Sequence, residues 1–159
     1  MKELKLSDLF NKDLIFTDYE ADSSTDLLNK LYKEVYRKGY VKNTFINGII
    51  EREKNYPTGL ETMHIKIAIP HTDAIHVNKS CITIAKLKHP VAFKNMATSV
   101  DDVNVEMVFM LAVHEPKEQV KVLQKIIGIF TNEEAMKKFK MAKTPDELLS
   151  IVFESVVDK

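Results

Sequence analysis

Residues 65–73 read Ile-Lys-Ile-Ala-Ile-Pro-His-Thr-Asp, and this stretch sets the fold class. Isoleucine recurs at every second position, which is the period of a β-strand, and Pro70 ends the run because it cannot donate a ladder hydrogen bond. His71 follows directly. A side chain at a strand end, in a loop fixed by proline, is held in place and is still accessible. We therefore expect a buried strand that presents a histidine at its end.

Four further segments have strand character. Leu14–Phe16 is short and apolar, and Cys81–Leu87 and Val91–Phe93 are two more β-rich runs. Residues 103–113 are apolar at every position from Met107 onward. Continuous apolar character is typical of a central strand that is covered by helices on both faces.

Two helices are predicted before residue 65. Residues 23–26, Ser-Ser-Thr-Asp, supply N-cap chemistry for the first, which Gly39 ends in the usual C′ manner. The second begins at about Asn43 and stops before Pro57.

Three more helices are predicted to close the chain. Pro116 suits a first-turn position, Asn132 can cap the next helix, and Thr144 begins a capping box that starts the last one. The first of these three has an apolar stripe that we expect to face inward: Val120, Leu123, Ile126, Ile127 and Phe130. The whole order predicts a single-domain α/β fold over residues 1–159, with a layered mixed β-sheet flanked by helices.

Composition excludes several classes of function. The chain has 159 residues, and its 23 basic and 23 acidic side chains cancel, so no positive excess is available for nucleic acid or an anionic membrane. The longest apolar run, residues 107–113, is far shorter than the ~20 residues that span a bilayer. Residues 1–5 lead into no apolar signal segment. One cysteine, Cys81, allows no internal disulfide and is expected to be a small buried hydrophobe. We therefore expect a cytoplasmic protein without membrane insertion.

Glycine usage argues against a nucleotide site. The four glycines are too far apart for a G-x-G-x-x-G loop, and no Gly-Lys-Ser/Thr sequence occurs. If the protein handles phosphate, a P-loop does not bind the donor.

Two residues have the chemistry of a phosphate-handling site. Neutral imidazole is a nucleophile toward phosphorus or carbon, which makes His71 a candidate, although an ordinary surface histidine is the commoner interpretation of residue chemistry alone. Arg52 is one of only two arginines among the basic residues. Its guanidinium can donate two parallel hydrogen bonds to phosphate, and the alternative is a cation that favours the end of its helix.

The loop between these two residues, 56–62, reads Tyr-Pro-Thr-Gly-Leu-Glu-Thr. Its backbone N–H groups and hydroxyls could line an anion site, although an ordinary Pro-Thr-Gly turn explains the same residues. A second alternative takes His71, Asp73 and His76 as metal ligands of a small hydrolase. Their spacing matches no specific zinc pattern, so we expect no metal.

Together, residues 56–62 and 67–73 resemble the signature of enzyme IIA domains of the sugar phosphotransferase system (PTS), in the fructose/mannitol superfamily. Residues 73–77, Asp-Ala-Ile-His-Val, are most similar to the galactitol-type members. The resemblance covers about residues 5–155 and implies the fructose/mannitol-type IIA fold.

The resemblance also implies a mechanism. The histidine matching His71 accepts a phosphoryl group on Nε2 from the phosphocarrier protein HPr and passes it to a IIB component, which serves a membrane IIC component. The arginine matching Arg52 balances the charge of the phosphate, and we expect Thr58, Gly59 and Thr72 to contribute to binding. No cofactor is implied. The transported substrate would be a sugar or a sugar alcohol such as galactitol.

One departure from the family pattern concerns a second site histidine. Many mannitol- and fructose-type members have it in the first turn of the helix after the long strand, where this chain has Gln119. His114 lies five residues earlier and does not occupy that place. A glutamine could donate a hydrogen bond to phosphate but could not carry charge. We expect that role for Gln119.

The alternative function is a regulatory IIA-like domain that phosphorylation of the same histidine switches. For either function we expect an apolar docking face around His71, formed by Leu60, Met63 and Ile75.

Overall fold

A five-stranded mixed sheet forms the middle layer of the protein. The computed structural model describes residues 5–156. The strands lie in the order β1–β4–β5–β3–β2. β1 pairs with β4, and β3 with β5, in parallel, whereas β4 with β5 and β2 with β3 are antiparallel. Their bounds are β1 (Phe10–Tyr19), β2 (Gly59–Leu60), β3 (Ile67–Ala68), β4 (Cys81–Lys94) and β5 (Asp102–Ala112).

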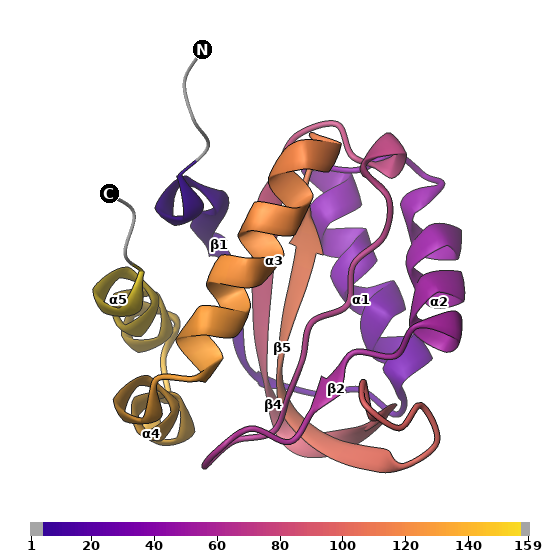
Figure 1. Ribbon diagram of the computed structural model, residues 1–159. Helices are drawn as coiled ribbons and strands as arrows, with labels where there is room; N and C mark the ends of the chain where they lie inside the picture. Colours follow the sequence, from indigo (N-terminus) through magenta and orange to yellow (C-terminus); the bar gives the residue numbers. More distant parts are fainter. Residues whose placement is uncertain (1–4, 157–159) are drawn as a thin grey trace.

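Helices cover both faces of this sheet, as Figure 1 shows. The helices are α1 (Ser24–Arg37), α2 (Phe45–Asn55), α3 (Pro116–Phe130), α4 (Glu133–Met141) and α5 (Pro145–Ser155). α1 and α2 pack on one face, and α3, α4 and α5 pack on the other. Two short 3₁₀ helices, η1 (Leu6–Leu9) and η2 (Ala74–His76), complete the chain. The predicted α/β fold with a flanked mixed sheet is confirmed.

Local capping explains where the helices begin. Ser23 Oγ accepts the N–H of Asp26 at 3.0 Å, and Asn132 Oδ1 accepts that of Ala135 at 3.1 Å. Thr144 Oγ1 accepts the N–H of Glu147 at 3.1 Å. Each bond satisfies an N–H group that the helix itself leaves free, so the three predicted caps are confirmed.

The strands differ from the predicted ones in length. β1 extends well beyond Leu14–Phe16 because β4 pairs along it. The two runs predicted as separate strands are one strand, β4, whose pairing with β5 is irregular between Lys86 and Val91. β2 was not predicted, since two residues with a glycine have no periodicity to detect.

The apolar face of α3 also differs from the predicted stripe. Ile126 and Phe130 are buried as expected, but Val120 is 59% exposed and Ile127 is 37% exposed. Val122 and Ile129 are buried instead. The prediction was wrong for two of the five residues because α3 turns Val122 and Ile129, and not Val120 and Ile127, toward the sheet.

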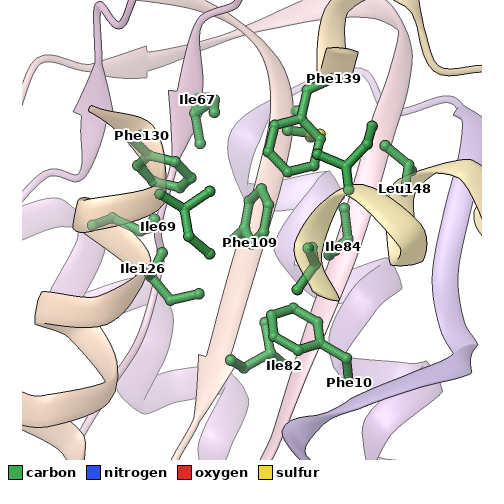
Figure 2. Packing of buried hydrophobic residues seen from close by; sticks show 14 of the residues in the cluster. Phe10, Ile67, Ile69, Ile82, Ile84, Phe109, Ile126, Phe130, Phe139 and Leu148 are labelled. Carbon is green, nitrogen blue, oxygen red and sulfur yellow. The ribbon is translucent and has the colours of Figure 1, made fainter. Parts of the chain in front are cut away.

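The core on the α3–α5 side is centred on Phe109 of β5, which Figure 2 shows between aromatic side chains of two helices. The ring of Phe109 lies edge-on to that of Phe130 of α3, at 5.2 Å between centroids, and to that of Phe139 of α4, at 5.8 Å. Edge-to-face pairs of this kind add to the stabilisation from burial. They fix α3 and α4 against the sheet, and α3 borders the candidate site.

Three other expectations concern Cys81, membrane-spanning segments and a signal segment. Cys81 is 1% exposed, and burial raises the pKa of its thiol to about 12, as expected of a small hydrophobic residue. Between residues 5 and 156, no helix has the length and apolar character that crossing a membrane requires. The expectation about a signal segment rests mainly on residues 1–4, which lie outside the described residues.

Candidate functional site

The backbone of residues 67–71, which comprise β3 and the segment after it, fixes the position of His71. β3 pairs in parallel with β5, and the chain then stays beside β5 as far as an isolated bridge between His71 and Leu111. The carbonyl of Pro70 accepts the N–H of Leu111 at 3.0 Å. In Figure 1 this segment passes between α3 and α2 on its way to η2. His71 is therefore held at the edge of the paired region, between two helices.

The imidazole of His71 is held in one tautomer. Its Nδ1 lies 2.8 Å from the carbonyl oxygen of Ile69. A carbonyl oxygen only accepts hydrogen bonds, so Nδ1 carries the proton and the lone pair is on Nε2. Burial lowers the pKa of His71 below the usual 6.5, and the nearby guanidinium of Arg52 lowers it further, whereas the bond to Ile69 and the charge of Asp73 oppose the shift. The ring is therefore a neutral nucleophile at pH 7.

We expect the imidazole of His71 to titrate with a midpoint below 6.5, because burial disfavours the charged ring. Since the folded pKa lies below the unfolded one, protonation favours unfolding, and the contribution of this group to stability is lost as the pH falls from about 6.5. Nitrogen-15 NMR of the ring across the pH range measures the midpoint and the tautomer. A midpoint at or above 6.5 would contradict the described environment.

Arg52 lies on α2 and faces the site with free hydrogen-bonding capacity. Its Nη1 is 3.6 Å from Oδ1 of Asp73, and its guanidinium carbon lies 4.9 Å from the centre of the Tyr56 ring. The Nε atom is buried and has no hydrogen-bond partner among the described residues. A long ion pair and a ring contact hold the guanidinium beside His71 without using the fork that would bind phosphate.

Gln119 ties α3 to the site. Its Nε2 donates to the carbonyl oxygen of Thr72 at 2.6 Å, and Thr72 is 4% exposed. His114 has a different role. Its ring Nδ1 bonds to the carbonyl of Val77 at 2.9 Å, and its backbone N–H donates to Ser80 Oγ at 2.8 Å. The glutamine thus lies against the loop that follows His71, and its hydrogen bond to phosphate stays a prediction.

Thr58 and Gly59 follow α2 and lie beside residues 68 and 69, which lead to His71. Thr58 is 2% exposed, and its hydroxyl already has two partners: it donates to Glu53 Oε1 at 2.8 Å and accepts the N–H of Ile69 at 3.2 Å. A Cβ on Gly59 would lie 2.6 Å from the carbonyl oxygen of Lys94, so this glycine permits close packing of β2 against the β4–β5 hairpin. Neither residue has a polar side-chain group free to receive a ligand.

The three residues considered as metal ligands have separate partners. His71 bonds to Ile69, Asp73 faces Arg52, and Nδ1 of His76 lies 2.8 Å from Thr44 Oγ1. Across the part of the chain that the structure describes, no group of three His, Cys, Asp or Glu side chains could hold a metal ion. His64 lies elsewhere, where its Nε2 is 2.9 Å from Glu133 Oε2.

Residues 8–155 match the family described as "Phosphoenolpyruvate-dependent sugar phosphotransferase system, EIIA 2". This chain belongs to that family. The galactitol-specific EIIA component of Escherichia coli (strain K12) is 35% identical over 104 residues, which cover 65% of this chain and 69% of that protein. The transcriptional regulator ManR of Bacillus subtilis (strain 168) is 35% identical over 111 residues, or 69% of this chain and 16% of the regulator.

The fold of this IIA chain is also that of a solved mannitol enzyme. Enzyme IIA-mannitol of Escherichia coli, solved in a complex with phosphorylated enzyme IIB-mannitol, superposes with a TM-score of 0.75 at 20% identity. The match covers 92% of this chain and 99% of that one. The expected fructose/mannitol-type IIA fold is confirmed.

Glu53 is the site-associated residue that the sequence analysis missed. Both of its carboxylate oxygens bond to Thr58, and desolvation raises its pKa to about 7. A signal was present in the sequence. Positions 45, 46, 49, 50 and 53 form one stripe of α2, and a carboxylate at the last of them interrupts a row of phenylalanine and isoleucine. A charged residue on the buried face of a helix is one to examine for a role in a site.

Proposed function

We propose that this IIA domain is a phosphocarrier that takes a phosphoryl group from phospho-HPr onto Nε2 of His71 and passes it to a IIB component. The hydrogen bond from Nδ1 of His71 to the Ile69 carbonyl carries this proposal, because it leaves a lone pair on Nε2. That pair forms the new P–N bond, while the electrons of the breaking P–N bond return to the donor imidazole. The proton on Nδ1 stays in place, and transfer to IIB reverses the roles.

Arg52 is the group that would stabilise the transferred phosphoryl. Phosphoryl transfer passes through a loose transition state in which the protein mainly positions the reactants and stabilises charge on the equatorial oxygens. The guanidinium beside His71 has uncommitted donors for those oxygens. An amide nitrogen carries two hydrogens, so Gln119 can keep its bond to Thr72 and still donate to phosphate. The N–H groups of the loop after His71, including that of Thr72, are further candidates.

The relatives support a transport role with a sugar alcohol as the final acceptor. The 35% identity with a galactitol-specific EIIA component favours galactitol, and the solved complex of a mannitol IIA with its IIB favours a IIB acceptor. HPr as the donor and a membrane IIC as the last component complete the proposed route. This route takes place in the cytoplasm, which is the location expected from composition.

We expect the docking face for these partners to be formed by Ile75 and Val120. Ile75 is 70% exposed in η2, four residues after His71, and Val120 is exposed next to Gln119. Met63 lies in the loop before β3, whereas His71 lies after it, so Met63 is at the other end of this part of the sheet. Leu60 packs against the core. The expectation that these two residues join the face is therefore replaced.

Replacing Ile75 and Val120 together with Asp is expected to raise the half-saturating concentration of phospho-HPr by about tenfold or more, because charges would enter an apolar contact. The maximal rate should change much less, since neither side chain touches the imidazole. Titration of the donor in a transfer assay measures both quantities. Met63→Asp is the control, and an effect as large in the control as in the double variant would contradict this docking face.

The alternative is a regulatory domain that phosphorylation of His71 switches. The identity with a segment of the regulator ManR favours it, since that protein contains a similar stretch within a much longer chain. The two functions differ in what happens after phosphorylation. A transport component loses its phosphoryl group rapidly to a IIB protein, whereas a regulatory domain retains it.

Incubation with phosphoenolpyruvate, enzyme I and HPr tests the proposal. Intact mass should show the gain of one phosphoryl group that is labile in acid, and a galactitol-type IIB protein added afterwards should remove it. No gain, while a control IIA domain is labelled in the same tube, would overturn the phosphocarrier role. A gain that IIB does not remove would favour the regulatory alternative.

A further inference from the structure

Glu53 has a half-buried carboxylate whose two oxygens both bond to Thr58. Oε2 accepts the backbone N–H of Thr58 at 2.8 Å, and Oε1 accepts the Thr58 hydroxyl at 2.8 Å. Burying a carboxylate costs free energy unless it is hydrogen-bonded, and here the loop after α2 supplies both bonds. The side chain therefore fixes Thr58 at its backbone and at its hydroxyl.

Thr58 extends this constraint to the strand that leads to His71. Its hydroxyl hydrogen points to Glu53, so its oxygen is available to accept, and it takes the N–H of Ile69 at 3.2 Å. Thr58 is 2% exposed and Ile69 is fully buried, so the bond between these two residues is shielded from water. The peptide N–H of Ile69 thus has a fixed acceptor.

The chain of bonds ends on the imidazole. The carbonyl of Ile69 accepts the Nδ1 proton of His71 at 2.8 Å. Residue 69 is therefore held at its N–H by Thr58 and holds the histidine by its carbonyl. A run of hydrogen bonds leads from the carboxylate of Glu53 to the ring nitrogen opposite Nε2.

We propose that Glu53, acting through Thr58 and residue 69, is a positioning residue for the imidazole of His71. This inference rests on the proposed function of His71. In-line phosphoryl transfer depends on the direction of the attacking lone pair, and small misplacements cost large factors in rate. α2 thus contributes two consecutive residues to the site. Arg52 lies beside the imidazole, and Glu53 bonds to Thr58 in the loop that follows the helix.

The test compares Glu53→Gln and Thr58→Val with Thr58→Ser and with Glu51→Gln. Glutamine keeps the length of the side chain but replaces one of its two acceptor oxygens with an N–H group, and valine keeps the shape of threonine but removes its hydroxyl. Serine restores the hydroxyl. Glu51 is exposed on the same helix, where it accepts a bond from Asn55 at 3.1 Å, so it controls for the same substitution on α2.

Rapid-quench transfer from phospho-HPr gives the maximal rate and the half-saturating donor concentration. Glu53→Gln and Thr58→Val are each expected to lower the maximal rate about tenfold with little change in half-saturation, because a fixed hydrogen bond is lost but not the docking face. Thr58→Ser should recover most of the rate, and Glu51→Gln should match the wild type.

Nitrogen-15 shifts of the His71 ring provide a readout that general destabilisation does not move. In Glu53→Gln and Thr58→Val they are expected to show a mixture of tautomers in place of the single Nδ1–H form. Folded variants with the wild-type rate and a single tautomer would overturn the proposal. So would variants that raise the half-saturating concentration of phospho-HPr but leave the maximal rate unchanged. If Thr58→Val does not fold, Glu53→Gln decides. If the wild type takes up no phosphate, the function of His71 fails, and the ring shifts still test the positioning.

Discussion

A His71→Ala variant is expected to take up no phosphoryl group from phospho-HPr, whereas the wild type gains one. The loss is complete because the proposed acceptor is the imidazole of His71 itself, and the two polar side chains that border it cannot replace it. Asp73 is paired with Arg52, and Gln119 is bonded to Thr72. The amide of a glutamine is not a nucleophile toward phosphorus at neutral pH. Intact-mass analysis after incubation with phosphoenolpyruvate, enzyme I and HPr measures the effect.

Two other histidine variants are the matched controls. His64 bonds to Glu133 away from the site, and His114 bonds to the carbonyl of Val77 before α3. His64→Ala and His114→Ala should both gain one phosphoryl group at close to the wild-type level. Label on the His71→Ala protein, or loss of label in His64→Ala with the fold intact, would contradict the assignment of the acceptor.

Arg52→Met is expected to slow transfer by about 10²–10³-fold, the usual effect of removing one group that stabilises charge in a transition state. Two effects add here. The donors for the equatorial oxygens are lost, and Asp73, no longer paired with the guanidinium, leaves a negative charge next to the incoming phosphoryl group. Single-turnover transfer from phospho-HPr measures the rate.

Arg52→Lys keeps the charge but loses the planar fork, so its rate should lie between those of the wild type and Arg52→Met. The other arginine of the chain, Arg37, pairs with Glu34 on α1 at 2.7 Å, and Arg37→Met should not affect transfer. Because the guanidinium lowers the pKa of His71, the methionine variant at position 52 should also titrate at higher pH. An unchanged rate with an unchanged midpoint would mean that Arg52 does not act on the imidazole.

Much of the fold followed from local patterns. The caps at Ser23, Asn132 and Thr144 depend on side chains within three residues of the N–H groups they accept, so sequence alone was sufficient. The continuous apolar run of β5 identified the central strand because only a strand buried on both faces needs it. The lengths of β1 and β4 were not predictable in this way, since pairing with a distant strand extends them.

For the candidate site, too, the sequence predicted some features and only the tertiary structure decided others. Pro70 and His71 follow a short apolar strand, and the motif was sufficient to identify the family. The roles of His71 and Arg52 stay predictions. Which α3 residues face outward depends on how the helix rotates against Phe109, so the exposure of Val120 came from the tertiary structure. The same holds for Met63, which is near His71 in the chain but lies before β3 rather than after it.

The sequence by itself determined the layered α/β fold and the IIA family, and it made His71 and Arg52 the candidates for the site, because these depend on residue type and short spacings. Only the tertiary structure decided the tautomer of His71 and the hydrogen bonds that lead to it from Glu53. Those depend on atoms from α2, the following loop and β3 meeting within hydrogen-bond distance. Hydrogen bonds are directional and short-ranged, so the pattern of a sequence does not specify them until the chain has packed.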